Sequence, residues 1–129
     1  MTRRFAGAAA VLLSVTLAAA AAHTSALDRV PARFRLRPNP FQGTPEAAAA
    51  GAKLFARHCA NCHAPGVTGR FRGPALNSFQ IRHAPPGALF WVITNGVVRR
   101  GMPPWAKLPE AQRWQIVTYL TAGPAPPPR

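Results

Sequence analysis

The chain has 129 residues, and its 16 Lys and Arg against 3 Asp and Glu give a formal net charge of +13. This length allows one modest domain and excludes a second of comfortable size. An acidic protein partner and compositional drift explain the excess of basic residues about equally well. The sequence shows no basic and aromatic recognition motif, which argues against binding to nucleic acid.

Residues 1–26 have the pattern of a secretory signal peptide, in which Arg3 and Arg4 precede an apolar run from Phe5 to Ala22. Small residues permit cleavage after position 22 or 26. The alternative is an uncleaved anchor that tethers the protein to a membrane, since the run approaches the ~20 residues that span a bilayer. We expect cleavage and a periplasmic protein without stable membrane insertion, because alanine is only weakly apolar.

Residues 27–43, LDRVPARFRLRPNPFQG, are rich in proline and arginine and show no helical period. This composition predicts an extended arm. The arm either docks on the domain through Phe34, Leu36 and Phe41 or stays a solvated tail, and the pattern leaves both open.

The main domain is expected over residues 44–122 as an all-α unit, because no convincing strand is visible. Thr44 can cap a helix and Pro45 suits its first position, so a helix is predicted from Pro45 towards Cys59. Spacings of four residues then place Gly51, Phe55 and Cys59 on one face of that helix.

Two further helices are predicted downstream. The sequence PGALFWVITN suits a helix over residues 86–95 that is ended by Gly96, and PEAQRWQIVTYLTA suits a last helix closed by Gly123. Between them, two prolines directly after Met102 predict a rigid loop. The tail, residues 123–129, is rich in proline and predicted to be disordered or polyproline-like.

The only two cysteines, Cys59 and Cys62, lie three residues apart and are followed at once by His63. Structural zinc needs four ligands, and the other histidines supply no second pair. A redox Cys-x-x-Cys usually opens a helix in a βαβ pattern, whereas this one closes a helix. Cys-x-x-Cys-His is a c-type haem attachment motif, in which thiols one turn apart bond the two vinyl groups and the histidine faces the iron.

Met102 is the candidate ligand for the opposite face of the iron, because Met1 lies in the signal segment and no other thioether remains. An ordinary core methionine is the alternative interpretation. His83 is a second candidate ligand. His58 lies too close to the attachment turn to reach that face and is expected at the surface.

Taken together, GAKLFARHCANCH, GPAL, NGVVRRGMPPW and IVTYL make residues 44–122 resemble a class I c-type cytochrome, of the small bacterial monohaem kind. The resemblance implies three to four helices wrapped around one covalent haem c. It implies that Gly51 sits at a close helix crossing, with Phe55 near Tyr119 and Leu120. It also implies that the carbonyl of Pro74 orients His63 and that Met102 is the distal ligand.

The function implied is periplasmic single-electron transfer by a carrier that is not itself an enzyme. A cytochrome subunit held on a quinoprotein-type dehydrogenase or oxidase is the alternative, and a gas- or peroxide-binding haem protein is the weaker one. Partners would be redox proteins with an acidic face, namely a dehydrogenase, an oxidase or another cytochrome. Arginines that would ring the haem edge and steer such partners are Arg70, Arg72, Arg99 and Arg100.

Overall fold

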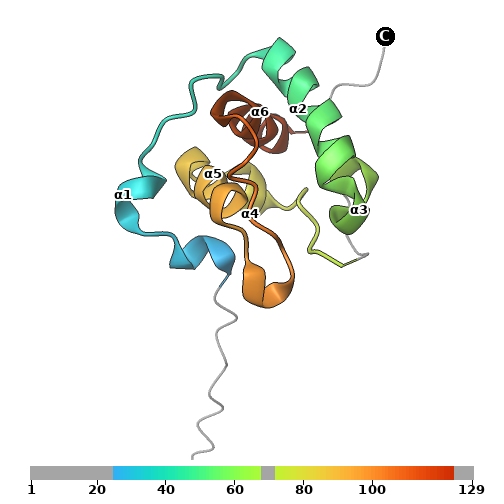
Figure 1. Cartoon of the computed structure of the whole chain (residues 1–129). Helices are drawn as coiled ribbons and strands as arrows, with labels where there is room; N and C mark the ends of the chain where they lie inside the picture. Colours follow the sequence, from blue (N-terminus) through green and yellow to red (C-terminus); the bar gives the residue numbers. More distant parts are fainter. Residues whose placement is uncertain (1–24, 68–71, 124–129) are drawn as a thin grey trace, which may run out of the picture.

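A computed structural model describes residues 25–67 and 72–123 (Figure 1). Its α-helices are α1 (Ala32–Arg35), α2 (Pro45–His58), α3 (Ala60–His63), α4 (Phe79–Arg82), α5 (Pro86–Asn95) and α6 (Glu110–Thr121). Single turns of 3-10 helix are η1 (Ala26–Arg29), η2 (Pro65–Val67) and η3 (Val98–Arg100). Within these ranges the only extended pairing is an isolated bridge between Val97 and Met102, so the all-α prediction is confirmed.

The three predicted helices form where their local sequence signals place them. Helix α2 begins at Pro45, although the Thr44 side chain makes no capping hydrogen bond. Helix α5 ends at Gly96, whose φ of +69° is a left-handed conformation suited to glycine. No helix in the described part of the chain is long and apolar enough to cross a membrane. The predicted signal peptide lies outside the described residues, apart from its last two positions, as does nearly all of the predicted tail.

Helices α2 and α6 cross in close contact, with α5 beside α6 (Figure 1). A Cβ atom on Gly51 would lie 2.0 Å from the carbonyl oxygen of Gln115, so only glycine allows this approach. The Phe55 and Tyr119 rings are 5.5 Å apart between centroids, as the family resemblance implied. The crossing is one side of a core made by Phe55, Ala84, Leu89, Phe90, Ile93, Trp114, Ile116, Val117 and Leu120.

The segment before α2 differs from the extended arm that its composition predicts. It forms the single turns η1 and α1, because Arg35 donates hydrogen bonds back to the carbonyl oxygens of Leu27 and Val30, at 2.7 and 3.0 Å. Val30 is buried at the same point. These bonds from a side chain to the backbone give local order to a segment without helical periodicity.

This segment, residues 25–43, is packed on the domain, and we refer to it as the strap. A Cβ on Gly87 would lie 2.1 Å from the Phe34 carbonyl oxygen, so the strap touches α5 directly. The buried Asn39 side chain donates a hydrogen bond of 2.9 Å to the Thr118 hydroxyl of α6. Phe34 and Phe41 contact the domain, as in the docked alternative, but Leu36 is 85% exposed and does not anchor the strap.

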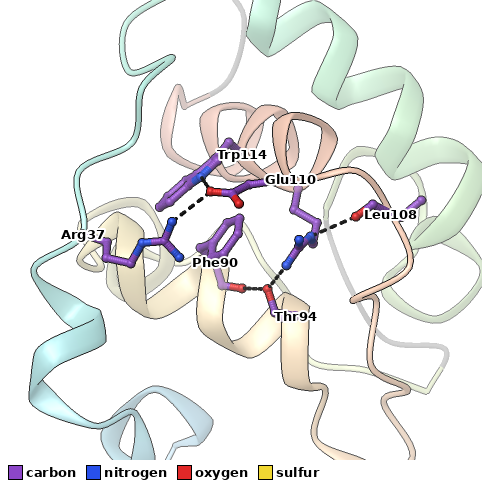
Figure 2. Close-up of polar contacts among 7 residues, drawn as sticks. Arg37, Phe90, Thr94, Leu108, Glu110 and Trp114 are labelled. Atoms are coloured by element: carbon purple, nitrogen blue, oxygen red, sulfur yellow. Dashed lines mark hydrogen bonds and ion pairs between the residues drawn. The ribbon is translucent and has the colours of Figure 1, made fainter.

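The strap also contributes to a polar cluster at the start of α6 (Figure 2). The Arg37 guanidinium lies 4.9 Å from the Phe90 ring centroid and pairs with the Glu110 carboxylate at 2.9 Å. Trp114 donates its indole N–H to the same carboxylate oxygen at 3.3 Å. Arg113, whose guanidinium lies 4.7 Å from the Phe90 ring centroid, donates to the Thr94 hydroxyl at 2.6 Å, which links α6 to α5.

Candidate functional site

The two cysteines and His63 occupy one tight turn at the end of α2. Cys59 directly follows the last residue of α2 and precedes the single-turn helix α3, and the backbone N–H groups of Cys62 and His63 both donate to its carbonyl oxygen, at 3.1 and 3.0 Å. Ala64 then has a φ of +62°, a conformation that costs a residue with a side chain energy. The chain therefore leaves the turn abruptly after His63.

Both thiols are free and partly exposed. Burial raises the pKa of Cys59 to about 11, and the neighbouring Cys62 adds to the rise. At neutral pH Cys59 is therefore a thiol, whereas the reactive cysteine of a thiol-disulfide couple needs a lowered pKa. The electrostatics of the turn therefore disfavour thiolate redox chemistry at Cys59.

The His63 ring is fixed by Pro74, eleven residues further along the chain. Its Nδ1 atom lies 2.9 Å from the Pro74 carbonyl oxygen. A carbonyl oxygen only accepts hydrogen bonds, so Nδ1 carries a proton, and in the neutral imidazole the lone pair is then on Nε2. The neutral imidazole is thus held in the tautomer that can bind a metal through Nε2.

Gly73 packs closely against the His63 ring. A Cβ atom at this position would lie 2.5 Å from Cε1 and 2.7 Å from Nδ1 of His63, closer than side chains tolerate. The Gly73 N–H donates to the Cys62 carbonyl oxygen at 3.0 Å, so the segment carrying Pro74 is tied to the attachment turn. The imidazole consequently lies in a tight cradle between this segment and its own turn.

Met102 lies on a separate segment, in a hairpin that follows α5. The Val97 and Met102 backbones exchange two hydrogen bonds, of 3.0 and 3.3 Å. A Cβ on Gly96 would lie 2.6 Å from the Met102 carbonyl oxygen, so the hairpin folds back tightly on the end of α5. Met102 is partly exposed and is absent from the hydrophobic core, which argues against an ordinary core methionine.

A contact between His58 and Trp105 joins the two segments. Their ring centroids are 5.3 Å apart, with the ring planes tilted by 57°. His58 immediately precedes Cys59, and Trp105 follows Met102 by three residues. His58 is half-buried under this ring, so its expected place at the surface is only partly correct.

The other candidate residues from the sequence are His83 and the four arginines expected around the haem edge. His83 stacks on Phe79 at 3.9 Å, and its Nδ1 lies 2.9 Å from the Phe79 carbonyl oxygen in an exposed part of the chain. Arg72 and Arg99 are exposed, and so is Arg100. Arg70 lies outside the described residues.

The sequence analysis did not predict the roles that three residues have in this site. Gly73 and Gly96 matter through close approach to His63 and Met102, and Trp105 matters through His58. A glycine beside a proline or an asparagine, as in RGP and TNG, was the available signal for the first two. Nothing in the sequence pairs His58 with Trp105.

Comparison with known proteins identifies the family of this chain. The family model for cytochrome C oxidase, cbb3-type, subunit III matches residues 46–120, from the second residue of α2 to the last but one of α6. The strap precedes the matched region. No curated protein matches the chain.

Solved structures with a similar fold include two cytochromes cL. That from the marine methylotrophic bacterium Methylophaga aminisulfidivorans MPT is 26% identical, with a TM-score of 0.56 over 64% of this chain and 57% of the other. That from Hyphomicrobium denitrificans is 18% identical, with a TM-score of 0.53 over 75% of this chain and 65% of the other. This chain therefore spans less than two thirds of the length of either, and the second likeness concerns the fold alone.

Proposed function

Because the chain belongs to the c-type cytochrome family described by the subunit III model of cbb3-type oxidase, we propose that it is a single-electron carrier and not an enzyme. Membership of this family implies covalently bound haem c. When bound, haem supplies a one-electron redox couple, and the protein sets its potential and accessibility. The observation that carries the proposal is the hydrogen bond between His63 and Pro74, beside two free cysteines on the same turn.

The residues of the attachment turn fit this group. Cys59 and Cys62 would form the two thioether bonds, since both are free and one helical turn apart. His63 would bind the iron through Nε2, because Nδ1 is committed to Pro74. Pro74 and Gly73 would hold the imidazole plane while its Nε2 binds.

Met102 would be the second axial ligand. It is the only methionine of the domain, and the hairpin that carries it is fixed to the end of α5 by backbone hydrogen bonds and by the close approach of Gly96. His/Met ligation is typical of cytochromes that transfer electrons and raises their potential. His83 is a poorer candidate because its ring already stacks on Phe79.

The surface beside Met102 would dock the redox partner. A shallow hollow there is lined by Pro103, Pro104, Trp105, Ala106 and Lys107. Val98 is 68% exposed in the same hairpin, next to the exposed Arg99. Apolar contact within a basic rim suits a partner with an acidic face, and rates of electron transfer to it would fall as salt rises.

The protein would work in the periplasm, after export directed by residues 1–26. The support is the sequence pattern of two arginines, an apolar run and small residues at its end. Mass spectrometry of the mature protein recovered from the periplasm tests this directly, since an N-terminus near residue 23 or 27 is expected. An intact N-terminus in the membrane fraction would indicate an anchor instead.

A permanent subunit of a quinoprotein-type dehydrogenase or oxidase is the second candidate. It is favoured by Leu36, which the folded strap holds at 85% exposure next to the exposed Arg37. A Leu36→Ser substitution separates the two candidates without disturbing the strap. It would release a bound subunit from its complex and leave a free carrier unaffected.

The test of the proposed function is the visible spectrum of holoprotein exported from a cell that attaches c-type haem. We expect a low-spin c-type spectrum in both redox states that carbon monoxide does not change. Ready gas binding by the wild-type protein would favour a gas- or peroxide-binding haem instead. Absence of covalent haem would overturn the assignment of Cys59 and Cys62.

A further inference from the structure

Trp105 contacts the helix that leads into the attachment turn, although it belongs to the loop that carries Met102. We propose that Trp105 is a positioning residue for Met102, acting through its ring contact with His58. The inference rests on the proposed function, since it concerns how firmly the Met102 thioether is held as an axial ligand. It assigns a role to two residues that lie outside the attachment motif and outside the ligand pair.

The backbone of Trp105 is fixed at the end of α5. Its N–H donates to the Ile93 carbonyl oxygen at 3.0 Å, and its own carbonyl oxygen accepts from the Leu108 N–H at 3.0 Å. These two bonds place the Trp105 backbone near the end of α5, and the indole ring adds a restraint from the end of α2. The indole ring therefore makes a separate contribution, which a substitution can remove while leaving the backbone anchor in place.

The link between Trp105 and Met102 is stiff. The two residues between them are Pro103 and Pro104, whose rings restrict φ to a narrow range. A shift of the Trp105 ring is therefore passed along the chain to Met102 and is not absorbed by the loop. On the other side, a Cβ atom placed on Gly96 would lie 2.6 to 2.7 Å from backbone atoms of Met102, Pro103 and Pro104, so this part of the loop packs closely against the end of α5.

The ring that the Trp105 indole contacts lies directly beside the attachment turn. His58 is the last residue of α2 and directly precedes Cys59. The ring centroids of His58 and Trp105 are 5.3 Å apart, within the range of stabilising aromatic pairs. The pair thus fastens the loop of the proposed distal ligand to the helix end that bears the first attachment cysteine.

A thioether is a weak and neutral ligand, so its occupancy of the iron depends on where the protein places it. A contact of this kind corresponds to roughly a 2- to 10-fold change in an equilibrium constant. Its loss should raise the fraction of time in which Met102 is dissociated by the same factor. Carbon monoxide reports that fraction, because it binds ferrous iron only when the thioether has left.

The experiment measures carbon monoxide binding to ferrous holoprotein for the wild type, Trp105→Ala, His58→Ala and the double variant. We expect each single variant to bind the gas roughly 2 to 10 times faster, and the double variant to resemble the larger single effect. Trp105→Phe keeps an aromatic ring and should behave much as the wild type does. The ferric charge-transfer band of the bond between iron and methionine sulfur should weaken in the same order.

Phe34→Ala is the matched control. It also removes one ring of a tilted aromatic pair, with Trp91 at 6.4 Å, but that pair lies between the strap and α5. It should lower thermal stability without changing gas binding. This separates positioning of Met102 from general loosening of the fold.

The outcomes distinguish the inference from the function on which it rests. Gas binding by the wild-type protein itself would overturn the His/Met assignment. A gas-resistant wild type with effects of Trp105→Ala and His58→Ala that multiply in the double variant, or that match Phe34→Ala, would overturn the positioning role alone. If Trp105→Ala is not loaded with haem, His58→Ala decides the matter, because it removes the contact from the other side and leaves the loop sequence intact.

Discussion

Gly96 and Met102 are in direct backbone contact, since a Cβ atom on Gly96 would lie only 2.6 Å from the Met102 carbonyl oxygen. The neighbouring atoms of Pro103 and Pro104 are equally close, at 2.6 and 2.7 Å. All three are backbone atoms that no rotamer change can move. The geometry of the proposed distal ligand is therefore set partly by the absence of a side chain at the end of α5.

Gly96→Ala should displace the hairpin that carries Met102. The new methyl group meets three backbone atoms of the loop that carries Met102, and overpacking of this kind typically costs about 1–3 kcal/mol. We expect the ferrous holoprotein to bind carbon monoxide readily while retaining both thioether bonds. The visible spectrum before and after addition of the gas gives the answer.

Gly101→Ala is the control for Gly96→Ala. Gly101 lies in the same hairpin with a φ of +87°, but nothing lies within 4 Å of a Cβ placed there. Gly96, with φ +69° and ψ −177°, and Gly101, with φ +87° and ψ 3°, both have backbone conformations that cost alanine energy, and Gly96→Ala adds the steric conflict. Equal gas binding by the two would show that backbone strain, and not contact with Met102, governs the loop.

Gly73→Ala should change the reduction potential of the holoprotein. A methyl group 2.5 Å from Cε1 of His63 would turn the imidazole and weaken its bond to Pro74. Loss of that bond makes the histidine a poorer electron donor, so the potential should rise by on the order of tens of millivolts. A redox titration checks this, with Gly43→Ala as a control because a Cβ there meets nothing. An unchanged potential would mean that Pro74 does not tune His63.

Gly51→Ala tests the crossing of α2 and α6. Alanine favours a helix over glycine by about 1 kcal/mol, so a purely local effect would stabilise the protein. The Cβ would instead lie 2.0 Å from the Gln115 carbonyl oxygen, and we expect a net loss of about 1–2 kcal/mol in the free energy of unfolding. Urea denaturation of the holoprotein measures it. A gain in stability would show that the helices separate at little cost.

The elements that the sequence predicts correctly are those whose signals are local. Helix α2 begins at the proline that marks it, and α5 ends at the glycine that marks its end. The burial of Phe55 and Trp114 follows from the periodicity of their own helices. The turn that carries Cys59 and His63 was equally predictable, because the spacing of the motif is itself the geometry of one helical turn.

The strap and the contact between His58 and Trp105 depend on partners remote in the sequence. Arg35 closes turns by donating hydrogen bonds to carbonyl groups, and Arg37 lies close to an α5 ring and an α6 ring that composition cannot pair with it. A segment rich in proline and arginine therefore predicts an extended arm, whereas in the structure tertiary contacts order this segment. Asn39 illustrates the same limit, since its buried partner Thr118 lies 79 residues away.

The polar cluster at the start of α6 makes stability depend on pH. The indole N–H of Trp114 holds the pKa of Glu110 below its ordinary value, with the Arg37 guanidinium adding to the effect. A carboxylate with a lowered pKa stabilises the folded state fully above its ordinary pKa and loses that contribution as pH falls through the lowered one. Thermal unfolding should therefore shift to lower temperature on the acid side of that range.

Glu110→Gln isolates this contribution. The amide cannot ionise, so the variant should be less stable than the wild type at neutral pH, and the difference should shrink as the solution is acidified through the lowered pKa. Glu46→Gln, at the exposed start of α2, serves as the matched control and should leave the acid-dependent loss in place. Thermal denaturation curves of the holoproteins at a series of pH values provide the comparison. A difference between Glu110→Gln and wild type that stays constant with pH would assign the role of Glu110 to packing instead of to charge.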